Sequence, residues 1–334
     1  MSESTLHLVG GRQKAEREIS EQPKWQHYAE ALIVSLDLDS GHLEPVVNYE
    51  SPPEVCPEEK PSILFKAGSR VGDRFYACTQ TEVVIYQLPD WTIARTISLP
   101  CFNDVHHVLP HSENSVLVVS TGLDLVVEVD WDGHILQEWS VTGDDTWDRF
   151  SRETDYRRIA STKPHVGHPN YVFECGGALW VTRANKGDAV CLTANREMPR
   201  MSEVPIHDGV LRGDFIYFTS VRGHVIRVAA ETGQVDRDFD LNEIANTHTP
   251  LGWCRGLHWL DEDRVAVGFS RLRGTRWQRN VRWVKHRLGG DGSGVMPTRI
   301  SVFDLKRSKL CREYDVEPAS LNAIFSIHDL NQSI

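Results

Sequence analysis

The sequence lacks the long apolar run that a membrane helix requires. Its apolar residues occur in short groups, far below the roughly 18 consecutive residues of a membrane span. The first twenty residues also lack a basic segment followed by an apolar core, so we expect no secretory signal. We therefore expect a protein without a membrane partner.

Paired cysteines are also missing. Seven cysteines are scattered over 334 residues, an odd number with no Cys-x-x-Cys pair. This pattern is unlike a zinc ribbon or a disulfide framework and is typical of reduced thiols, so we expect a cytoplasmic location. We expect most of these cysteines to be small buried side chains.

Positively charged residues are fewer than negatively charged ones. Lys and Arg number 36 against 47 Asp and Glu, which gives a net charge of −11. Such an acidic chain makes nucleic acid an unlikely partner, although a local basic patch stays possible. Walker-type and GxGxxG phosphate loops, HExxH and GxSxG motifs are absent. With 40% hydrophobic residues, the chain can still build an ordinary globular core.

The sequence does contain a repeat. Residues 115–141 read as three short strands rich in Val, Ile and Leu, separated by turns with Gly and Asp. An upstream apolar segment adds a fourth strand, and the pattern recurs at a spacing of about forty residues, which describes β-propeller blades. The other units are 74–99, 178–204, 214–241 and, around an insertion, 254–270 with 298–316.

The two ends of the chain supply an incomplete unit each. The segment SLNAIFSIHDL near the C-terminus is one strand without a blade, and residues 1–48 contain strands without an inner partner. We predict an all-β fold, a six-bladed β-propeller formed by 1–334 as a single domain. Its last blade combines 1–48 with 320–334, which closes the ring and removes exposed sheet edges.

The long connections are expected on one face of this propeller. Insertions 142–166 and 271–297 join strands at the end where the innermost strands begin, and long loops on a rigid scaffold commonly carry function. In the second insertion, Trp277, Val281, Val284 and Leu288 are spaced as one face of a helix. We expect helical insertions over the mouth of the channel.

Histidines cluster at the starts of the predicted inner strands. Neutral imidazoles that converge in a channel can bind zinc, iron or manganese. The alternative is a polar channel whose side chains bind one another and water. Because strand residues alternate, only one of two neighbouring histidines can face the channel unless a bulge intervenes, and we expect His107 to do so. The predicted metal ligands are His106, His107, His168 and His207, with His165 nearby.

Basic and amide side chains are expected around the same opening. The guanidinium group suits carboxylate, phosphate or sulfate, which predicts a small anionic substrate. The alternative is a solvated cationic face or a contact with an acidic subunit, so an oligomer stays possible. The predicted substrate-binding residues are Arg183, Arg222, Arg255, Arg271, Arg273, Asn170 and Asn322.

The blade pattern resembles the six-bladed propellers of the gluconolactonase/NHL type. A bacterial propeller family without an assigned reaction is resembled by a set of segments, namely NDVHHV, STGLD, HPN, HDG, GWCRG, GFSRLR and LNAIFSI. Gluconolactonase-type enzymes hold a divalent metal with Glu, Asn and Asp, to which Asp104, Asn170, Asp208 and Asn322 are the nearest parallels here. The histidines of this sequence resemble more closely those of the peptidyl-amide lyases, which hold zinc with histidines of inner strands. Both comparisons are analogies at the level of the fold.

Together these features predict a metal-dependent hydrolase or lyase that acts on a small anionic substrate. Asp104 and Asp208 are the candidate catalytic residues, since a carboxylate beside a metal-bound water can take its proton. One alternative is a non-catalytic propeller that serves as a ligand- or protein-binding platform. A second is an iron or copper oxidoreductase.

Overall fold

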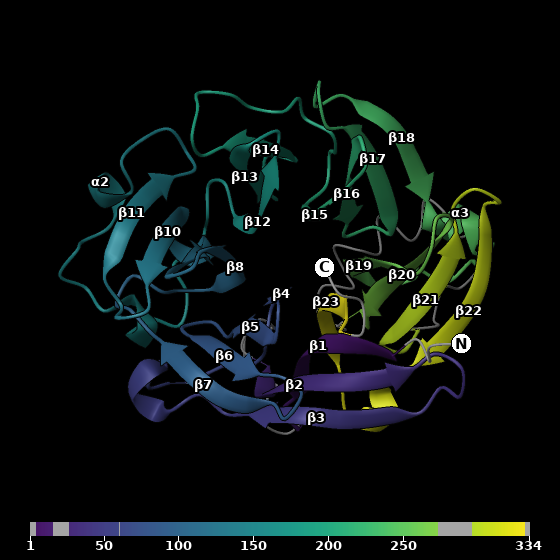
Figure 1. Ribbon diagram of the computed structural model, residues 1–334, viewed down its shortest axis with the longest axis horizontal. Helices are drawn as coiled ribbons and strands as arrows, with labels where there is room; N and C mark the ends of the chain where they lie inside the picture. Colours follow the sequence, from purple (N-terminus) through teal and green to yellow (C-terminus); the bar gives the residue numbers. More distant parts are fainter. Residues whose placement is uncertain (1–4, 16–26, 60, 273–295, 331–334) are drawn as a thin grey trace.

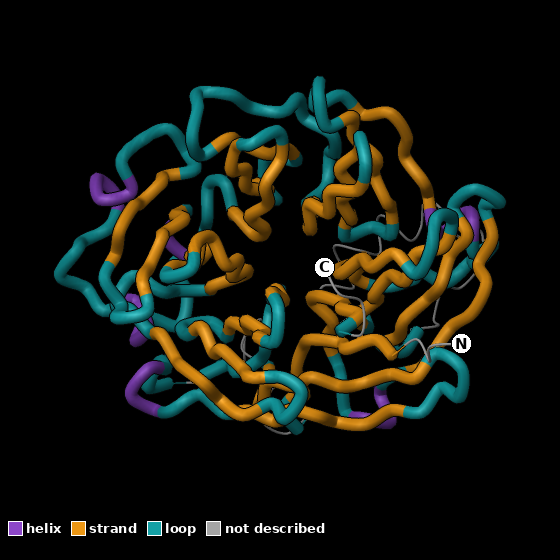
Figure 2. The backbone as a smooth tube through the Cα atoms, in the orientation of Figure 1, coloured by secondary structure: helices purple, strands orange, loops and turns teal. Residues whose placement is uncertain are grey.

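Six small antiparallel sheets surround a central channel (Figure 1). The computed structural model describes residues 5–15, 27–59, 61–272 and 296–330. The predicted all-β, six-bladed propeller is confirmed, and short helical turns are confined to the connections (Figure 2). Within the described ranges, no helix has the length and apolar character needed to cross a bilayer.

Blades 1 and 2 have four strands each. Their strands are β4 (Ser69–Val71), β5 (Arg74–Cys78), β6 (Val83–Gln87), β7 (Thr92–Ile97), β8 (Val105–Ser112), β9 (Ser115–Ser120), β10 (Leu125–Asp130) and β11 (Ile135–Ser140). The inner strand of blade 1 begins at Ser69, just after the apolar segment SILFKAG (62–68) that lies upstream of the unit 74–99. Ala67 of this segment bridges to His107 of blade 2.

Blade 3 has three strands where four were predicted, and blades 4 and 5 have four. The outer place of blade 3 is taken by an irregular segment that includes Pro199, and proline cannot donate a ladder hydrogen bond. These strands are β12 (Pro169–Cys175), β13 (Ala178–Arg183), β14 (Asp188–Cys191), β15 (Ile206–Arg212), β16 (Phe215–Ser220), β17 (His224–Ala229), β18 (Val235–Asp240), β19 (Trp253–Trp259), β20 (Arg264–Ser270), β21 (Arg299–Asp304) and β22 (Lys309–Asp315).

The last blade joins the two ends of the chain, as predicted. The C-terminal strand β23 (Ala323–Asp329) is innermost and pairs with β1 (Thr5–Gln13), followed by β2 (Tyr28–Asp37) and β3 (Leu43–Tyr49). The helical turns are η2 (Pro53–Val55), η3 (Thr121–Leu123), α2 (Thr146–Arg149), η4 (Tyr156–Arg158), α3 (Leu241–Ile244) and η5 (Glu317–Ala319). Insertion 142–166 thus contains two of them, and most of insertion 271–297, with its predicted helix, lies outside the described residues.

The core consists of apolar layers between neighbouring blades. Strands in the middle of a blade are covered on both faces, so β9 (SVLVVS) is buried along its whole length, whereas the outer strand β7 (TIARTI) is largely exposed. Six of the seven cysteines are buried, as expected, and all seven, which lie in the described part of the chain, are free thiols. This packing fixes the inner strands rigidly around the channel.

Candidate functional site

A pocket of about 700 Å³ lies at the face where the inner strands begin. Parts of the long connections line it, among them Lys163, Pro205 and Gly252, so the predicted face is confirmed as the one that holds the pocket. Its polar wall carries four histidines (His106, His165, His168 and His207), four cationic side chains (Lys66, Lys163, Arg222 and Arg255) and one carboxylate among the described lining residues, Asp104. Its apolar wall includes Tyr28, Leu64, Trp253, Leu272 and Phe325.

Bulges at the starts of the inner strands shape the pocket. The pairing registers of β8, β12, β15, β19 and β23 shift where unpaired residues are inserted. A bulge changes the direction of its side chain, and three of these extra residues, His106, Arg255 and Phe325, line the pocket. Asp104, His168 and Asp208 also adopt positive φ angles of 52°, 55° and 65°.

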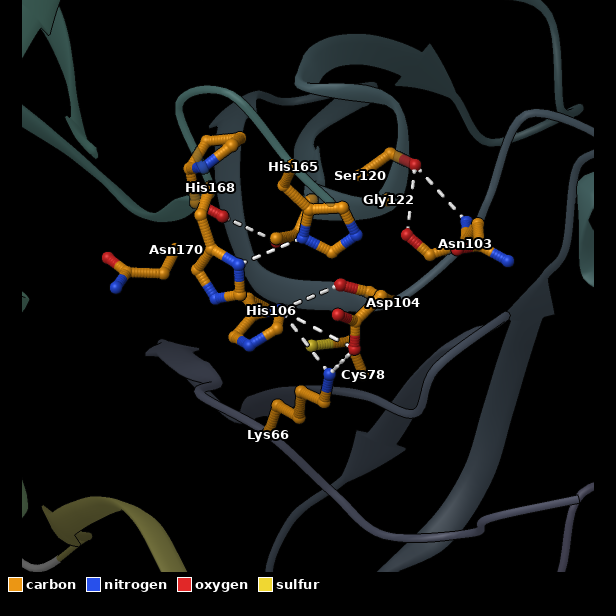
Figure 3. A network of polar contacts seen from close by, with 12 residues as sticks. Lys66, Cys78, Asn103, Asp104, His106, Ser120, Gly122, His165, His168 and Asn170 are labelled. Atoms are coloured by element: carbon orange, nitrogen blue, oxygen red, sulfur yellow. Dashed lines mark hydrogen bonds and ion pairs between the residues drawn. The ribbon is translucent and has the colours of Figure 1, made fainter. Parts of the chain in front are cut away.

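A buried ion pair lies beneath His106. Lys66 Nζ contacts Asp104 Oδ1 and lies 3.3 Å from Nδ1 of His106, three residues that Figure 3 shows side by side. Nδ1 of His106 is also 2.7 Å from the backbone carbonyl of Asp104. A carbonyl only accepts, so this nitrogen carries the proton of the neutral ring and Nε2 keeps its lone pair.

A hydrogen-bonded chain orients His168 (Figure 3). The Thr162 hydroxyl donates to the Gly122 carbonyl and therefore accepts from Nε2 of His165, which is 3.3 Å away. Nδ1 of His165 must then accept from Nδ1 of His168, 2.9 Å away. This donor and acceptor pattern leaves Nε2 of His168 unprotonated.

Arg255 and Asn170 hold His207 on the opposite side. The Arg255 Nε donates to Nε2 of His207 at 3.2 Å, and Nδ2 of Asn170 lies 2.7 Å from Nδ1 of the same ring. The Arg255 guanidinium lies over the Phe325 ring, 4.7 Å from its centre. The Arg255 side of the pocket is thus built on an aromatic surface.

Burial keeps these histidines neutral. It lowers the pKa of His106, His168 and His207 well below the usual 6.5, and the positive charges of Lys66 and Arg255 add to the effect on His106 and His207 respectively. Burial by itself would raise the pKa of Asp104, but the Lys66 ammonium and the neighbouring His106 bring it well below its usual range. Burial also lowers the pKa of Lys66, against the opposing charge of Asp104.

The expectation that His107 faces the channel is wrong. Its ring is fully buried and stacks on Tyr171 at 3.9 Å between centroids, while His106 occupies the bulge and lines the pocket. Nδ1 of His107 accepts from the Val172 N–H and Nε2 contacts the Ser69 hydroxyl, so both nitrogens are engaged. His107 is a packing residue between blades and not a pocket ligand.

Three other predicted residues lie outside the pocket lining. Asp208 is buried behind it, where it accepts from the Thr219 hydroxyl and the Gly256 N–H, and burial raises its pKa to about 6. Asn170 supports His207 from behind, and Asn322 accepts from the Gln13 N–H. All three lie behind the pocket wall instead of lining it, and their predicted catalytic and substrate-binding roles stay predictions.

Some of the predicted arginines line the pocket and others pair with carboxylates elsewhere. Arg222 and Arg255 line the pocket, but Arg183 is buried in a fork with Asp188 and also pairs with Glu197. Arg271 forms a fork with Glu317 instead of facing the opening. The remaining predicted arginine, Arg273, lies outside the described residues.

The four predicted histidine ligands do not fit one metal ion. His107 and His207 have both ring nitrogens engaged, which leaves His106 and His168. Among the residues that the structure describes, the one group of three potential ligands with atoms within 4.8 Å of one another is Asp130, Asp132 and His134, on a partly exposed hairpin turn. A zinc, iron or manganese ion in the pocket stays a prediction.

Sequence reasoning missed Lys66, Lys163 and Thr162. Lys66 is the single charged residue of the segment SILFKAG, directly before an inner strand, and that was the available signal. Lys163 and Thr162 lie in an insertion without periodicity, so nothing in the sequence marked them. Their place at the pocket depends on the path of the loop.

The fold and the pocket define a class: a six-bladed β-propeller with a basic, histidine-rich pocket at the channel mouth. No family model matches the sequence, and no curated protein matches it. Among solved structures, a protein of unknown function from Bacteroides caccae is 12% identical, covers 97% of this chain and 98% of its own, and has a TM-score of 0.60.

Two further solved structures have similar coverage. A chain of a nidogen/laminin complex is 11% identical over 98% of this chain and 99% of its own, with a TM-score of 0.58. A streptogramin B lyase is 13% identical over 95% and 84%, with a TM-score of 0.49. At these identities the first two chains share a fold with this chain and no more. The expected six-bladed propeller is confirmed by the six sheets of the structure itself.

Proposed function

We propose that this propeller binds a small anionic molecule in the mouth pocket and acts on it as a hydrolase or lyase, with His168 as general base. The observation that carries the proposal is the Thr162–His165–His168 chain. It leaves an imidazole lone pair on His168 in a pocket with four cationic side chains.

The charge of the pocket supports an anionic ligand. In a chain with a net charge of −11, the described lining residues include four cations and one carboxylate, and that carboxylate is already paired with Lys66. Arg255 lies against Phe325 and, at 5.8 Å, over Trp253. A planar guanidinium on aromatic rings suits a carboxylate attached to an apolar or aromatic group.

The chemistry follows from the neutral histidines. Nε2 of His168 takes a proton from a water in hydrolysis, or from the carbon beside an electron-withdrawing group in elimination. The resulting imidazolium is stabilised by its hydrogen bond to His165 and by the negative charge of Asp104, which favours the protonated form. Asp104 therefore acts through its charge, since its carboxylate is already paired with the Lys66 ammonium.

Binding tests the anionic part of the proposal. We expect benzoate to bind the purified protein and the uncharged isostere benzamide not to bind, measured by calorimetry. Arg255→Gln should weaken benzoate about 10- to 100-fold, because a charged hydrogen-bond donor is worth about 1.5–3 kcal/mol. Arg212→Gln is the matched control, since Arg212 also lies over an aromatic ring, 4.1 Å from the centre of Trp259, but does not line the pocket. Equal affinity for benzoate and benzamide contradicts the proposal.

Measurements of turnover test the proposed role of His168 as general base. Small carboxylate esters, lactones and β-substituted acids, followed by NMR in D₂O, report hydrolysis and elimination together. His168→Gln should reduce turnover at least 100-fold, while His258→Gln, a largely buried histidine outside the pocket, should not. Ligand binding without turnover in the wild type, unchanged in His168→Gln, would instead support the non-catalytic platform.

Elemental analysis of protein purified without a histidine tag tests the metal-dependent form of the activity. A stoichiometric ion that raises the melting temperature supports the metal-dependent form, and the absorption and paramagnetic spectra of that ion then separate zinc from an iron or copper redox centre. Less than one transition-metal ion per chain contradicts the metal-dependent form and leaves the acid–base chemistry of His168.

A further inference from the structure

We propose that Asp124 is a positioning residue of the pocket. Its carboxylate holds the loop 162–168 so that His168 meets His165 and presents an unprotonated Nε2. The proposal rests on the base role of His168, and it adds a residue that neither lines the pocket nor touches a ligand there.

The carboxylate of Asp124 binds three consecutive backbone N–H groups. Oδ1 accepts from Gly167 at 3.0 Å and His168 at 2.8 Å, and Oδ2 accepts from Val166 at 2.8 Å. Arg149 donates to Oδ2 at 3.0 Å. Asp124 is only 1% exposed, so these charge-assisted bonds form without competition from bulk water.

Asp124 is itself fixed by blade 2. It ends the turn η3 in a left-handed conformation with φ 52°, and it lies between the buried strands β9 and β10. The Val141 N–H donates to its backbone carbonyl. A rigid element of blade 2 thus supplies the anchor for the loop that enters blade 3.

The anchor stabilises a conformation that His168 would not adopt by itself. Its φ of 55° is left-handed, a conformation that is unfavourable for a non-glycine residue. The bond from its N–H to Asp124 offsets this cost and sets the direction of the ring. The Nδ1-to-Nδ1 contact with His165, and with it the position of the proton on His168, depends on that direction.

The preceding glycine allows the close approach. A Cβ on Gly167 would lie 3.4 Å from Asp124 Oδ1 and 3.1 Å from Cγ2 of Val141. The segment STGLD of blade 2, which ends with Asp124, and the segment HVGHPN of blade 3, which contains His168, therefore act together to position the His168 ring.

Histidine NMR tests the proposal without a known substrate. In ¹⁵N-histidine protein, with His168→Gln used for assignment, we expect wild-type His168 to be protonated on Nδ1 alone. Asp124→Asn places an amide NH₂ against backbone donors, so we expect a mixture of the two His168 tautomers and at least tenfold slower turnover. Benzoate affinity should stay within about threefold, because Arg255 lies on blade 5.

Asp304→Asn is the matched control. Asp304 is 3% exposed and also binds a backbone N–H and an arginine, both of Arg307, but it does not line the pocket. Its variant should leave the His168 signals unchanged. If Asp124→Asn fails to fold, Asp124→Gly removes the carboxylate, adopts the left-handed φ of 52° without strain and should produce the same mixture.

Unchanged His168 signals in a folded Asp124→Asn or Asp124→Gly protein overturn the proposal. The tautomer readout is independent of turnover, so the two proposals fail separately. A shifted His168 tautomer in a protein without any activity supports the positioning role and rejects the base role.

Discussion

At the scale of single residues, the pocket depends on charges that are buried in pairs. Lys66 is 4% exposed and its ammonium contacts Asp104, 38 positions away in the sequence. Such a pair contributes little net stability, but removal of one partner leaves an uncompensated charge in a dry environment. The two charges of the pair also act on His106 and His168, because Lys66 lowers the pKa of both rings and Asp104 raises it.

We therefore predict that Asp104→Asn lowers the free energy of unfolding by about 3–5 kcal/mol. The double variant Lys66→Met, Asp104→Asn should recover most of this loss, because no charge of the pair then remains and asparagine tolerates the φ of 52° at position 104. Urea denaturation of the three proteins measures the effect. A double variant as unstable as Asp104→Asn would show that the loss comes from packing and not from charge.

At the scale of elements, the bulged starts of the inner strands decide which side chains enter the pocket. In β19 two residues, Arg255 and Gly256, oppose one residue of β20. Gly256 has φ 77°, and a Cβ there would lie 3.1 Å from Cα of Ser326 in the neighbouring strand β23. Glycine thus lets the bulge that carries Arg255 pack tightly against the split blade.

Gly256→Ala should destabilise the protein by the left-handed conformation, about 1–2 kcal/mol, and by overpacking, about 1–3 kcal/mol more. Gly72→Ala separates the two costs, since Gly72 has φ 59° but no atom within 4 Å of an added Cβ. Thermal unfolding of both variants measures the difference. Equal losses would mean that the contact with β23 does not constrain the bulge.

At the scale of the whole molecule, neutral histidines are buried around much of the ring. Burial lowers the pKa of His7 to about 4 and that of His107 and His328 to about 3, in addition to the histidines of the pocket. Below the unfolded value near 6.5, the unfolded chain binds protons that the folded chain does not. Stability is therefore complete above pH 6.5 and is lost as the pH falls towards the folded values.

We predict a steep loss of stability as the pH falls from about 6.5 to about 4. Each such histidine contributes up to about 1.4 kcal/mol per pH unit. His107→Gln should flatten the dependence by about that amount, because Gln can still accept from the Val172 N–H. The exposed His134→Gln is the control, and chemical denaturation at several pH values is the measurement. An unchanged slope in His107→Gln contradicts the argument.

The sequence by itself determined the repeat, the six blades, the closure by both ends and the face that holds the pocket. These follow from local patterns, since strand alternation and turn residues recur in every unit. The histidines at the inner-strand starts and the basic residues Arg222 and Arg255 were visible in the same way. Cytoplasmic location, oligomeric state, substrate and metal stay predictions.

Only the tertiary structure decided which of these residues share the pocket. A one-residue bulge directs His106 into the pocket and leaves His107 between blades. Three further predicted residues form hydrogen bonds with neighbouring groups and do not line the pocket: Arg183, Asp208 and Asn322. The contacts of Lys66 with Asp104 and of Asp124 with His168 join residues about forty positions apart. Such contacts depend on how neighbouring blades pack and on the path of one irregular loop, and neither leaves a periodic signal in the sequence.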